Sequence, residues 1–599
     1  MIYHCEDYTC NYWDEGEKLP ERCPQCGRKL LRANEADMTG DDWTALGNTL
    51  WDAEASDKKR MVDCFRKAAY LGSAWGVCNL GICMEQGNGV EADPVQAFWL
   101  YRQAVEMGSL NAVCCLGVCY QYGIGTAPDA KQAAELYCKA AEYGSPRGQM
   151  LLARAFHDGI GVEADAAEAV YWVRAAAYQR YGEGMHRLGV CYEYGDGVEQ
   201  NWEHAVHWFR EAAESGVSVA MTDLGYCYEK GCGVEQSWEQ AFSWYRRGAE
   251  CGYPVSMSNL GLCYKRGYGV EQNWQEAVKW YEQGAQCGHL QSMNNLACCY
   301  EDGEGVEQNE ERALYWYRRS AEGGNGGAMY NLGRCYKMGH GVEQNWQEAV
   351  KWYEQGAQCG NLQSMHNLAC CYEHGEGVEQ NMTEAIRWYT AAAEGGNADD
   401  MYELGWQYDH GEGVEQDMKK AICWYERAAE QNHPAAMNSL GECYAMGRGV
   451  PRDLETAMEW YRRAAELGEA MADYNMGWHL EQAGKLSEAY AHYRKAADGN
   501  DDSAWWALGR FYENGVVVAQ DGKEARRCYE TGEKLGSVKC KMRLARCKLL
   551  GIGGRRAKKA GLDLCRQALE LAKESSEKED YGYEAEMNLL RRTIAENES

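Results

Sequence analysis

The sequence predicts an all-α fold, an α-solenoid of about 14–15 stacked helix pairs that follows a small N-terminal domain. Three observations lead to this fold class. A helical signature recurs every 36 residues, one position in each repeat is a preferred helix N-cap residue, and four cysteines lie within the first 26 residues. A period of this size indicates stacked repeats, because one helix pair can bury its apolar face only against its neighbours.

Each repeat contains an anchor residue, which is Gly or Ala, inside its first helix. In residues 255–288, Met257, Leu260 and Cys263 have helical spacing and predict the first helix. Apolar residues between positions 277 and 285 predict the second helix, and a Gly-x-Gly-Val loop joins the two. The anchors in register are Gly81, Gly117, Ala153, Gly189, Gly225, Gly261, Ala297, Gly333, Ala369, Gly405, Gly441 and Gly477.

The start of the second helix is predicted by its N-cap residue. Asn273 precedes the second helix of its repeat, and its side chain can accept a hydrogen bond from the first turn. Glu276, or Glu348 in a later repeat, would complete a capping box. The equivalent residues are Asp93, Asp129, Asp165, Asn201, Ser237, Asn309, Asn345, Asn381, Asp417 and Asp453.

Composition and charge exclude several classes of partner. Lys+Arg total 61 and Asp+Glu total 91, so the formal charge is -30 and the chain should repel nucleic acids and anionic lipids. The sequence shows no export signal and no apolar run of membrane-spanning length. We therefore expect a cytoplasmic protein without a membrane partner, and we do not expect nucleic acid to be its main partner.

The repeat motifs resemble a known family. Leu-Gly-x-x-Tyr, Gly-x-Gly-Val, Glu-Ala-x-x-Trp-Tyr and Ala-Ala-Glu are similar to the Sel-1-like repeat, a relative of the tetratricopeptide repeat, over roughly residues 41–565. The resemblance implies a right-handed superhelix and the role of an adaptor for other proteins. Units anchored on Gly47 and Gly477 lack the Gly-x-Gly loop and look like plain tetratricopeptide repeats, and the unit near Ala545 is basic and irregular.

These features predict four regions. Residues 1–32 form a metal-binding knuckle domain, 33–40 a linker, 41–574 the solenoid, and 575–599 a capping helix or tail. Atypical ends are expected, because they protect a repeat stack from water.

The knuckle domain is predicted to bind zinc. Cys5, Cys10, Cys23 and Cys26 have the spacing C-x4-C-x12-C-x2-C, and two close thiolate pairs suit tetrahedral zinc. The second pair resembles zinc-ribbon and rubredoxin-like knuckles, whereas the first departs from their usual two-residue spacing. His4 could therefore replace Cys5, iron is an alternative to zinc, and free thiols on a disordered arm are the alternative to any metal site.

Two residue columns are interpreted as core. Nine cysteines fall two residues after an anchor, and successive repeats place them too far apart for disulfides. A tryptophan column in the second helices is expected in the core as well. The cysteines are Cys83, Cys119, Cys191, Cys227, Cys263, Cys299, Cys335, Cys371 and Cys443; the tryptophans are Trp172, Trp208, Trp244, Trp280, Trp316, Trp352, Trp388, Trp424 and Trp460.

Enzyme activity is not expected. Cysteine-rich relatives have been linked to β-lactam hydrolysis, but neither Ser-x-x-Lys nor Gly-x-Ser-x-Gly occurs here with a suitable partner, and no strand is expected before the Gly-x-Gly loops. His366 and His374 replace Asn294 and Asp302 of a near-identical block, which we interpret as a sign that histidine is dispensable there.

The predicted function is a non-catalytic protein-interaction scaffold. Asparagines two residues before the anchor fall on the inner face if the repeats align with tetratricopeptide repeats, and an amide can both donate to and accept from an extended peptide. Acids including Glu301 and Glu373 lie beside them, so a basic segment is the expected ligand. Local hydrogen bonds are the structural alternative, and a zinc-dependent regulatory or nucleic-acid-associated factor is the alternative function. The predicted ladder is Asn259, Asn295, Asn331 and Asn367.

Overall fold

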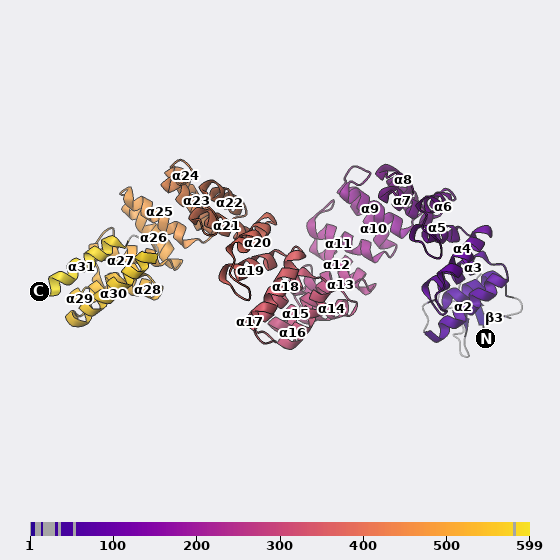
Figure 1. The fold of residues 1–599 in the computed structure, drawn as a ribbon, viewed down its shortest axis with the longest axis horizontal. Helices are drawn as coiled ribbons and strands as arrows, with labels where there is room; N and C mark the ends of the chain where they lie inside the picture. The colour runs from indigo at the N-terminus through magenta and orange to yellow at the C-terminus, as the bar shows by residue number, and fades with distance from the viewer. Residues whose placement is uncertain are drawn as a thin grey trace. The chain divides into compact units, whose positions relative to one another are not determined.

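The computed structural model describes residues 2–5, 13–15, 30–33, 38–51, 55–578 and 583–598. The chain divides into two compact units, Met1–Asn309 and Glu310–Ser599. Within each unit consecutive helices pack as pairs joined by short loops (Figure 1). In the described residues from 40 onward every element is a helix, and the helix pairs that repeat within each unit confirm the predicted helical solenoid.

A small antiparallel sheet comes first. It consists of β1 (Ile2–Cys5), β2 (Trp13–Glu15) and β3 (Leu30–Ala33), with β1 in the centre. In the backbone register His4 lies opposite Trp13 on β2, and Cys5 lies opposite Leu30 on β3.

The first unit contains fifteen helices among its described residues. They are α1 (Gly40–Thr49), α2 (Ala55–Tyr70), α3 (Ala74–Gln86), α4 (Pro94–Glu106), α5 (Leu110–Tyr122), α6 (Ala130–Glu142), α7 (Pro146–Asp158), α8 (Ala166–Tyr178), α9 (Gly182–Tyr194), α10 (Trp202–Glu214), α11 (Ser218–Lys230), α12 (Trp238–Glu250), α13 (Pro254–Arg266), α14 (Trp274–Gln286) and α15 (Leu290–Asp302).

The second unit contains the remaining helices. They are α16 (Glu310–Glu322), α17 (Gly326–Met338), α18 (Trp346–Gln358), α19 (Leu362–His374), α20 (Met382–Glu394), α21 (Ala398–His410), α22 (Met418–Glu430), α23 (Pro434–Met446), α24 (Leu454–Glu466), α25 (Ala470–Gln482), α26 (Leu486–Asp498), α27 (Asp502–Asn514), α28 (Gly522–Lys534), α29 (Val538–Leu550), α30 (Lys558–Lys578) and α31 (Glu584–Glu598).

The even-numbered helices begin where the N-cap residues predict. The Asn273 side chain accepts from the backbone N–H of Glu276 at 3.1 Å. The Glu276 carboxylate pairs with Lys279 rather than closing a capping box, and Glu348 does the same with Lys351. Side-chain caps also form at Asp93, Asp129, Asp165, Asn201, Ser237, Asn345, Asn381, Asp417 and Asp453.

The Gly-x-Gly loops are structural turns, as predicted. Gly267 ends α13 with a left-handed backbone (φ +73°). Gly269, also left-handed, passes so close to the preceding helix pair that a Cβ would lie 2.2 Å from the carbonyl oxygen of Trp238. Both positions therefore require glycine for backbone reasons.

Odd-numbered helices line one side of each unit. Each packs on its even-numbered partner, and odd-numbered helices of successive repeats also touch. Helices that approach one another along a stack lie on its shorter, inner side, so we call them the inner helices and the even-numbered ones the outer helices. The contacts between inner helices include α1–α3, α3–α5, α5–α7, α11–α13, α13–α15, α17–α19 and α27–α29.

The stack ends in a longer outer helix and one extra helix. The expected boundary at residue 574 falls inside α30, and α31 packs on α29 and α30. Arg543 Nε lies 2.6 Å from Glu586 of α31, and both side chains are largely buried. Within the described residues, no helix is both long and apolar enough to cross a bilayer.

Candidate binding pocket on the inner helices

A column of tyrosines fills the space between the two helices of most repeats. Tyr281 of α14 is fully buried against the anchor Gly261, where a Cβ would lie 2.5 Å from the ring. The anchor is glycine because the aromatic ring occupies the space that a Cβ would need. The other glycine–tyrosine pairs are Gly81–Tyr101, Gly117–Tyr137, Gly225–Tyr245, Gly333–Tyr353, Gly405–Tyr425, Gly441–Tyr461, Gly477–Tyr493 and Gly509–Tyr529.

The tryptophan column is not the core, which corrects the prediction. Only Trp244 of that column is buried, at 8% exposure. Neighbouring residues on a helix point about 100° apart, so the residue that follows each tryptophan, a tyrosine in most repeats, takes the inward position. The half-buried members are Trp172, Trp208, Trp280, Trp316, Trp352, Trp388, Trp424 and Trp460. The nine cysteines that fall two residues after an anchor are all buried, as predicted.

The core tyrosines also fix side chains on the inner helices. The Tyr245 hydroxyl donates to Glu229, four residues after the anchor, at 2.9 Å. Where Lys265 takes that position, the Tyr281 hydroxyl has no hydrogen-bond partner in the described structure. Equivalent bonds join Tyr101 to Glu85, Tyr137 to Gln121, Tyr389 to Glu373, Tyr493 to Glu481 and Tyr529 to Glu513.

Among the repeats from α3 to α28, one lacks both the tyrosine and its carboxylate partner. On α8, Val173 stands where the other outer helices have the core tyrosine, and Ala153 is the anchor on α7. His157 stands in the position of the carboxylate. The next repeat has Phe209, a ring without a hydroxyl. Since valine fills much less space than tyrosine, this repeat leaves a gap in the column.

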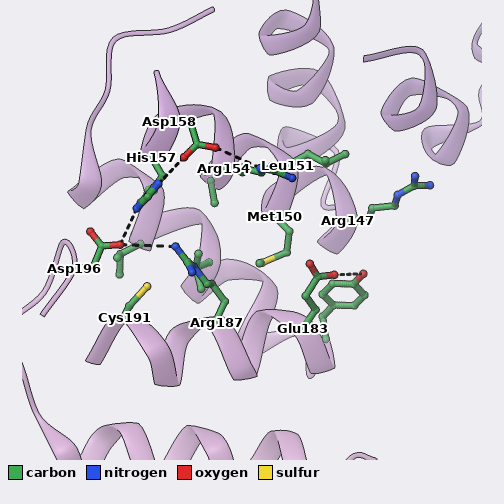
Figure 2. A pocket seen from close by; sticks show the side chains of 15 residues that line it. Arg147, Met150, Leu151, Arg154, His157, Asp158, Glu183, Arg187, Cys191 and Asp196 are labelled. Atoms are coloured by element: carbon green, nitrogen blue, oxygen red, sulfur yellow. Dashed lines mark hydrogen bonds and ion pairs between the residues drawn. The ribbon is translucent and has the colours of Figure 1, made fainter. Parts of the chain in front are cut away.

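A pocket of about 570 Å³ occupies this place, between α7, α8 and α9. Its apolar lining includes Met150, Leu151, Val170 and Val173, and charged side chains surround it (Figure 2). This volume lies within the range of sites that accept small molecules or large side chains. We call this site the inner pocket.

An ionic network forms one side of the inner pocket. His157 bridges two carboxylates, with Nδ1 2.7 Å from Asp158 and Nε2 3.1 Å from Asp196 (Figure 2). Arg154 reaches Asp158 at 3.3 Å, and Arg187 lies 3.9 Å from Asp196. The hydrogen bond from His157 contributes most to lowering the pKa of Asp158. The carboxylates on this side are therefore already engaged by cationic or histidine side chains.

A different arrangement lies on the opposite side. Arg147 donates to the side-chain carbonyl of Asn111 at 2.6 Å and to the sulfur of Cys115 at 3.5 Å. A hydrogen bond with Cys78, followed by the charge of Arg147, lowers the pKa of Cys115 to about 7. These partners of Arg147 carry no carboxylate, so the guanidinium can bind an anionic group that enters the pocket.

The pocket contains one thiol, and it is unsuited to nucleophilic catalysis. Burial raises the pKa of Cys191 to about 11, so this thiol is protonated at neutral pH. The pocket thus has an apolar floor and a rim of mixed charge. The charged residues are Arg147, Arg154, Arg187, Asp158, Glu183 and Asp196.

The predicted asparagine ladder lies on inner helices in both units. Asn259 and Asn295 are half-buried on the contacting helices α13 and α15, and Asn331 and Asn367 are half-buried on α17 and α19. Asn295 accepts from the Gln291 side chain at 2.9 Å, and Asn367 donates to the backbone oxygen of residue 363 at 2.9 Å. The members of each pair thus lie on contacting helices, and peptide binding stays a prediction.

The predicted acids are half-buried on the same helices. Glu301 is on α15 and Glu373 on α19. The Glu373 carboxylate accepts a hydrogen bond from the core residue Tyr389 at 2.7 Å, so one of its oxygens is already engaged within the chain.

Three of the four predicted zinc ligands, Cys10, Cys23 and Cys26, lie outside the described residues. Only the backbone of His4 and Cys5 is described, at the end of β1. Across the part of the chain that the structure describes, no group of His, Cys, Asp and Glu is arranged to hold a metal ion. Zinc binding therefore stays a prediction.

The helix pairs, the glycine–tyrosine packing and the capped loops define a helix-pair repeat protein. The family model described as Sel1 repeat matches thirteen segments and most of the solenoid, and the chain belongs to this family. The matched residues are 76–109, 112–145, 146–181, 182–217, 218–253, 254–289, 290–325, 327–361, 362–397, 398–433, 434–469, 470–501 and 504–537.

Two solved structures are similar to this chain. The crystal structure of c5321, a protective antigen present in uropathogenic Escherichia coli strains with an SLR fold, shares 32% identity at a TM-score of 0.50 and covers 75% of this chain and 97% of its own. A Sel1 repeat protein from Oxalobacter formigenes shares 33% identity over 41% of this chain and 96% of its own, at a TM-score of 0.38. No curated protein matches the chain.

Sequence reasoning missed the inner pocket although the signal was present. Aligning the repeats twenty residues after each anchor shows Val173 in a column that is otherwise almost entirely aromatic. The replacement of the acid by His157 four residues after the same anchor is a second signal.

Proposed function

We propose that the chain is a non-catalytic protein-interaction scaffold that holds a segment of another protein along its inner helices, with one side chain of the partner in the inner pocket. The observation that supports this proposal most directly is the replacement of the core tyrosine by Val173, beside a pocket lined by inner-helix side chains. Membership of the Sel1 repeat family, whose solenoids generally serve as scaffolds, agrees with it.

The inner pocket favours a particular kind of partner side chain. Its apolar floor would bury an aliphatic or aromatic group, and Arg147 would pair with a carboxylate or a backbone carbonyl beside it. Elsewhere the inner helices carry acids, and the chain has a formal charge of -30. We therefore propose a partner with a basic segment that follows the asparagines and an apolar residue that enters the pocket.

The test of the pocket is a substitution that restores the regular repeat. Val173→Tyr should fill the pocket and weaken binding of a captured partner by tenfold or more, measured by titration with the purified partner. Val95→Tyr, on the exposed side of outer helix α4, is the matched control and should leave affinity unchanged. Equal affinity of the wild type and Val173→Tyr would contradict the use of the pocket.

The asparagine pairs are tested separately, because they lie in different units. Asn259→Ala with Asn295→Ala, and Asn331→Ala with Asn367→Ala, each remove two amides that we expect to contribute about 0.5–1.5 kcal/mol apiece. A pair that binds the peptide should weaken affinity with little change in melting temperature. Association should also slow as salt increases, because exposed charges are screened over about 8 Å at physiological ionic strength.

A zinc site in the N-terminal segment is a second proposal, and the sheet register supports it. Cys5 lies opposite the first residue of β3, four residues after Cys26. His4 lies opposite the first residue of β2, three residues after Cys10. The three strand ends that are nearest to the cysteines in the sequence therefore lie at the same end of the sheet. A metal held there would stabilise a domain too small to fold on its own core.

Metal analysis of purified protein tests the zinc proposal. We expect about one zinc per chain, lost in the Cys23→Ser, Cys26→Ser variant while the helical signal persists. Iron in place of zinc would indicate a rubredoxin-like site, and His4→Ala compared with Cys5→Ser would identify the fourth ligand. Metal-free protein from zinc-replete growth would exclude the zinc site.

A binding measurement with RNA and DNA tests the alternative function. Tight, salt-sensitive binding would favour a nucleic-acid-associated factor over a scaffold.

We place the protein in a reducing compartment, the cytoplasm. The support is that the 25 cysteines whose side chains the structure describes form no disulfide there, and more than half of them are buried. Thiol counting on native and denatured protein tests this, since a large drop in melting temperature on reduction would instead indicate structural disulfides.

A further inference from the structure

Two nearly identical blocks of the chain differ around one pair of cysteines. Residues 273–309 and 345–381 match at 34 of 37 positions. Cys298 on α15 and Cys370 on α19 are equivalent, and the helix around each reads Leu-Gln-Ser-Met-x-Asn-Leu-Ala-Cys-Cys. The three differences are His289 and Asn361, Asn294 and His366, and Asp302 and His374.

One of these differences connects Cys370 to a buried carboxylate. His366 Nδ1 lies 2.8 Å from Asp400 on α21, and His366 Nε2 lies 3.6 Å from Cys370 Sγ. At the equivalent positions 72 residues earlier the chain has Asn294 and Ala328. The Asp–His–Cys chain therefore forms around Cys370, and both the histidine and the aspartate are missing at the positions equivalent to it around Cys298.

The burial of Asp400 determines the charge of His366. Asp400 is fully buried, and its second oxygen, Oδ2, has no hydrogen-bond partner in the described structure. A buried carboxylate is very costly unless a positive charge compensates it. The hydrogen bond to Asp400, followed by that to Cys370, raises the pKa of His366 to about 10. His366 is therefore an imidazolium at neutral pH.

The imidazolium of His366 lies beside the sulfur of Cys370, with Nε2 at 3.6 Å from Sγ. Both nitrogens of a protonated histidine are donors, so Nε2–H points its charge at Sγ. The Tyr389 hydroxyl lies 3.4 Å from Sγ, but its proton is directed to Glu373 at 2.7 Å. The adjacent Cys371 is different, because burial raises the pKa of its thiol to about 12.

We propose that Cys370, beside the His366–Asp400 pair, is a modification site for small uncharged oxidants of the peroxide class. The half-buried sulfur admits a small reagent, and Glu373 and Glu403 on the same side disfavour an anionic one. The proposal concerns modification of the chain and is independent of the proposed scaffold function.

The reaction with hydrogen peroxide balances with the groups present. The thiolate sulfur attacks one peroxide oxygen, and the O–O bond breaks. The leaving hydroxide takes the Nε2 proton of His366 and departs as water. Sulfur is oxidised to a sulfenic acid, peroxide is reduced, and His366 is left neutral.

Competitive labelling of the native full-length protein tests the proposal. Limiting iodoacetamide, and separately hydrogen peroxide with a sulfenic-acid probe, are followed by peptide mass spectrometry that distinguishes Cys370 from Cys298. We expect Cys370 to react at least tenfold faster than Cys298 at pH 7.

The chain supplies matched variants for this experiment. His366→Asn installs the residue of the sister block and should reduce the Cys370 rate to that of Cys298. His374→Asp is the control, since it also copies the sister block, and the printed contact of His374 with Cys370 is to the backbone carbonyl at 3.0 Å and not to the sulfur. It should leave the rate nearly unchanged. Asp400→Ala should act like His366→Asn.

Two results would overturn the inference. Equal labelling of Cys370 and Cys298, or a Cys370 rate unaffected by His366→Asn, would exclude activation of Cys370 by His366. Fast alkylation without a sulfenic acid adduct would exclude peroxide as the reagent.

Discussion

The regular repeats and the repeat around the inner pocket differ in what occupies the space beside the anchor residue. In most repeats a tyrosine fills the space against the anchor and its hydroxyl orients an inner-helix side chain, as Tyr245 does with Glu229. In the α7–α9 region the ring is absent, and His157 binds neighbouring aspartates instead. A single side-chain position thus decides whether a repeat provides rigidity or a cavity. In a chain of near-identical units, removing a side chain creates a distinct site without changing the fold.

The largest expected effect is the loss of a core ring. Tyr281→Ala should destabilise the first unit by about 3–5 kcal/mol, the usual range for deleting a buried aromatic side chain. Trp280→Ala, next to it but half-buried, should cost clearly less. Denaturant unfolding of both variants measures the difference. A larger loss for Trp280→Ala would restore the tryptophan column as the core.

The sequence was sufficient to predict the helix pairs because their signals are local. The N-cap at Asn273 and the glycine turn at Gly267 act within a few residues, and both were placed correctly. The choice between Trp280 and Tyr281 was not local. It depends on which ring reaches Gly261, twenty residues back in the chain, and adjacent aromatic residues have similar periodicity.

The candidate sites show the same limit. The asparagine positions on the inner helices follow from the repeat alignment alone. To predict the inner pocket one must know that Ala153 and Val173 lie together on two different helices. To predict the Cys370 site one must know that Asp400 of the next repeat contacts His366. The presence of Asn294 at the equivalent position predicts that His366 is dispensable. The structure shows that the hydrogen-bond partner of His366, Asp400, is also replaced at the equivalent position.

The next largest effect is expected when the missing aromatic ring is restored at position 173. Val173→Tyr should raise stability by about 1 kcal/mol, because a ring would bury apolar surface in the inner pocket. Ala153 should tolerate it, since Tyr317 and Tyr389 are buried in repeats that also have alanine anchors. Thermal unfolding measures the change. A loss of more than about 2 kcal/mol would indicate overpacking and a pocket closed by other side chains.

A smaller effect isolates the hydroxyl of the core tyrosine. Tyr245→Phe removes the bond to Glu229 and should cost about 0.5–1.5 kcal/mol. Tyr281→Phe is the matched control, because that hydroxyl is buried and has no partner in the described structure. The control should be neutral or slightly stabilising. Equal losses in the two variants would show that the hydrogen bond contributes nothing specific.

The smallest expected effect concerns a carboxylate whose repeat has Phe209 in place of the core tyrosine. Burial, followed by the charge of Asp223, raises the pKa of Glu193 above its ordinary value of 4.5. The folded chain then holds this proton more tightly than the unfolded chain, so the stability from Glu193 is full below pH 4.5 and is lost as pH rises through the raised pKa. At pH 7 the ionised carboxylate is unfavourable. Glu193→Gln should therefore raise the melting temperature at pH 7 and leave it unchanged at pH 4.

The control for this last effect is Glu229→Gln in the next repeat. Gln121 already accepts from Tyr137 in the equivalent position, so a glutamine can replace the hydrogen bond to Tyr245. Glu229→Gln should thus change the melting temperature little at pH 7. If the gain from Glu193→Gln were the same at pH 4 and pH 7, the strain would not come from the ionised carboxylate. The contrast between the phenylalanine and tyrosine repeats would then have to rest on ring packing alone.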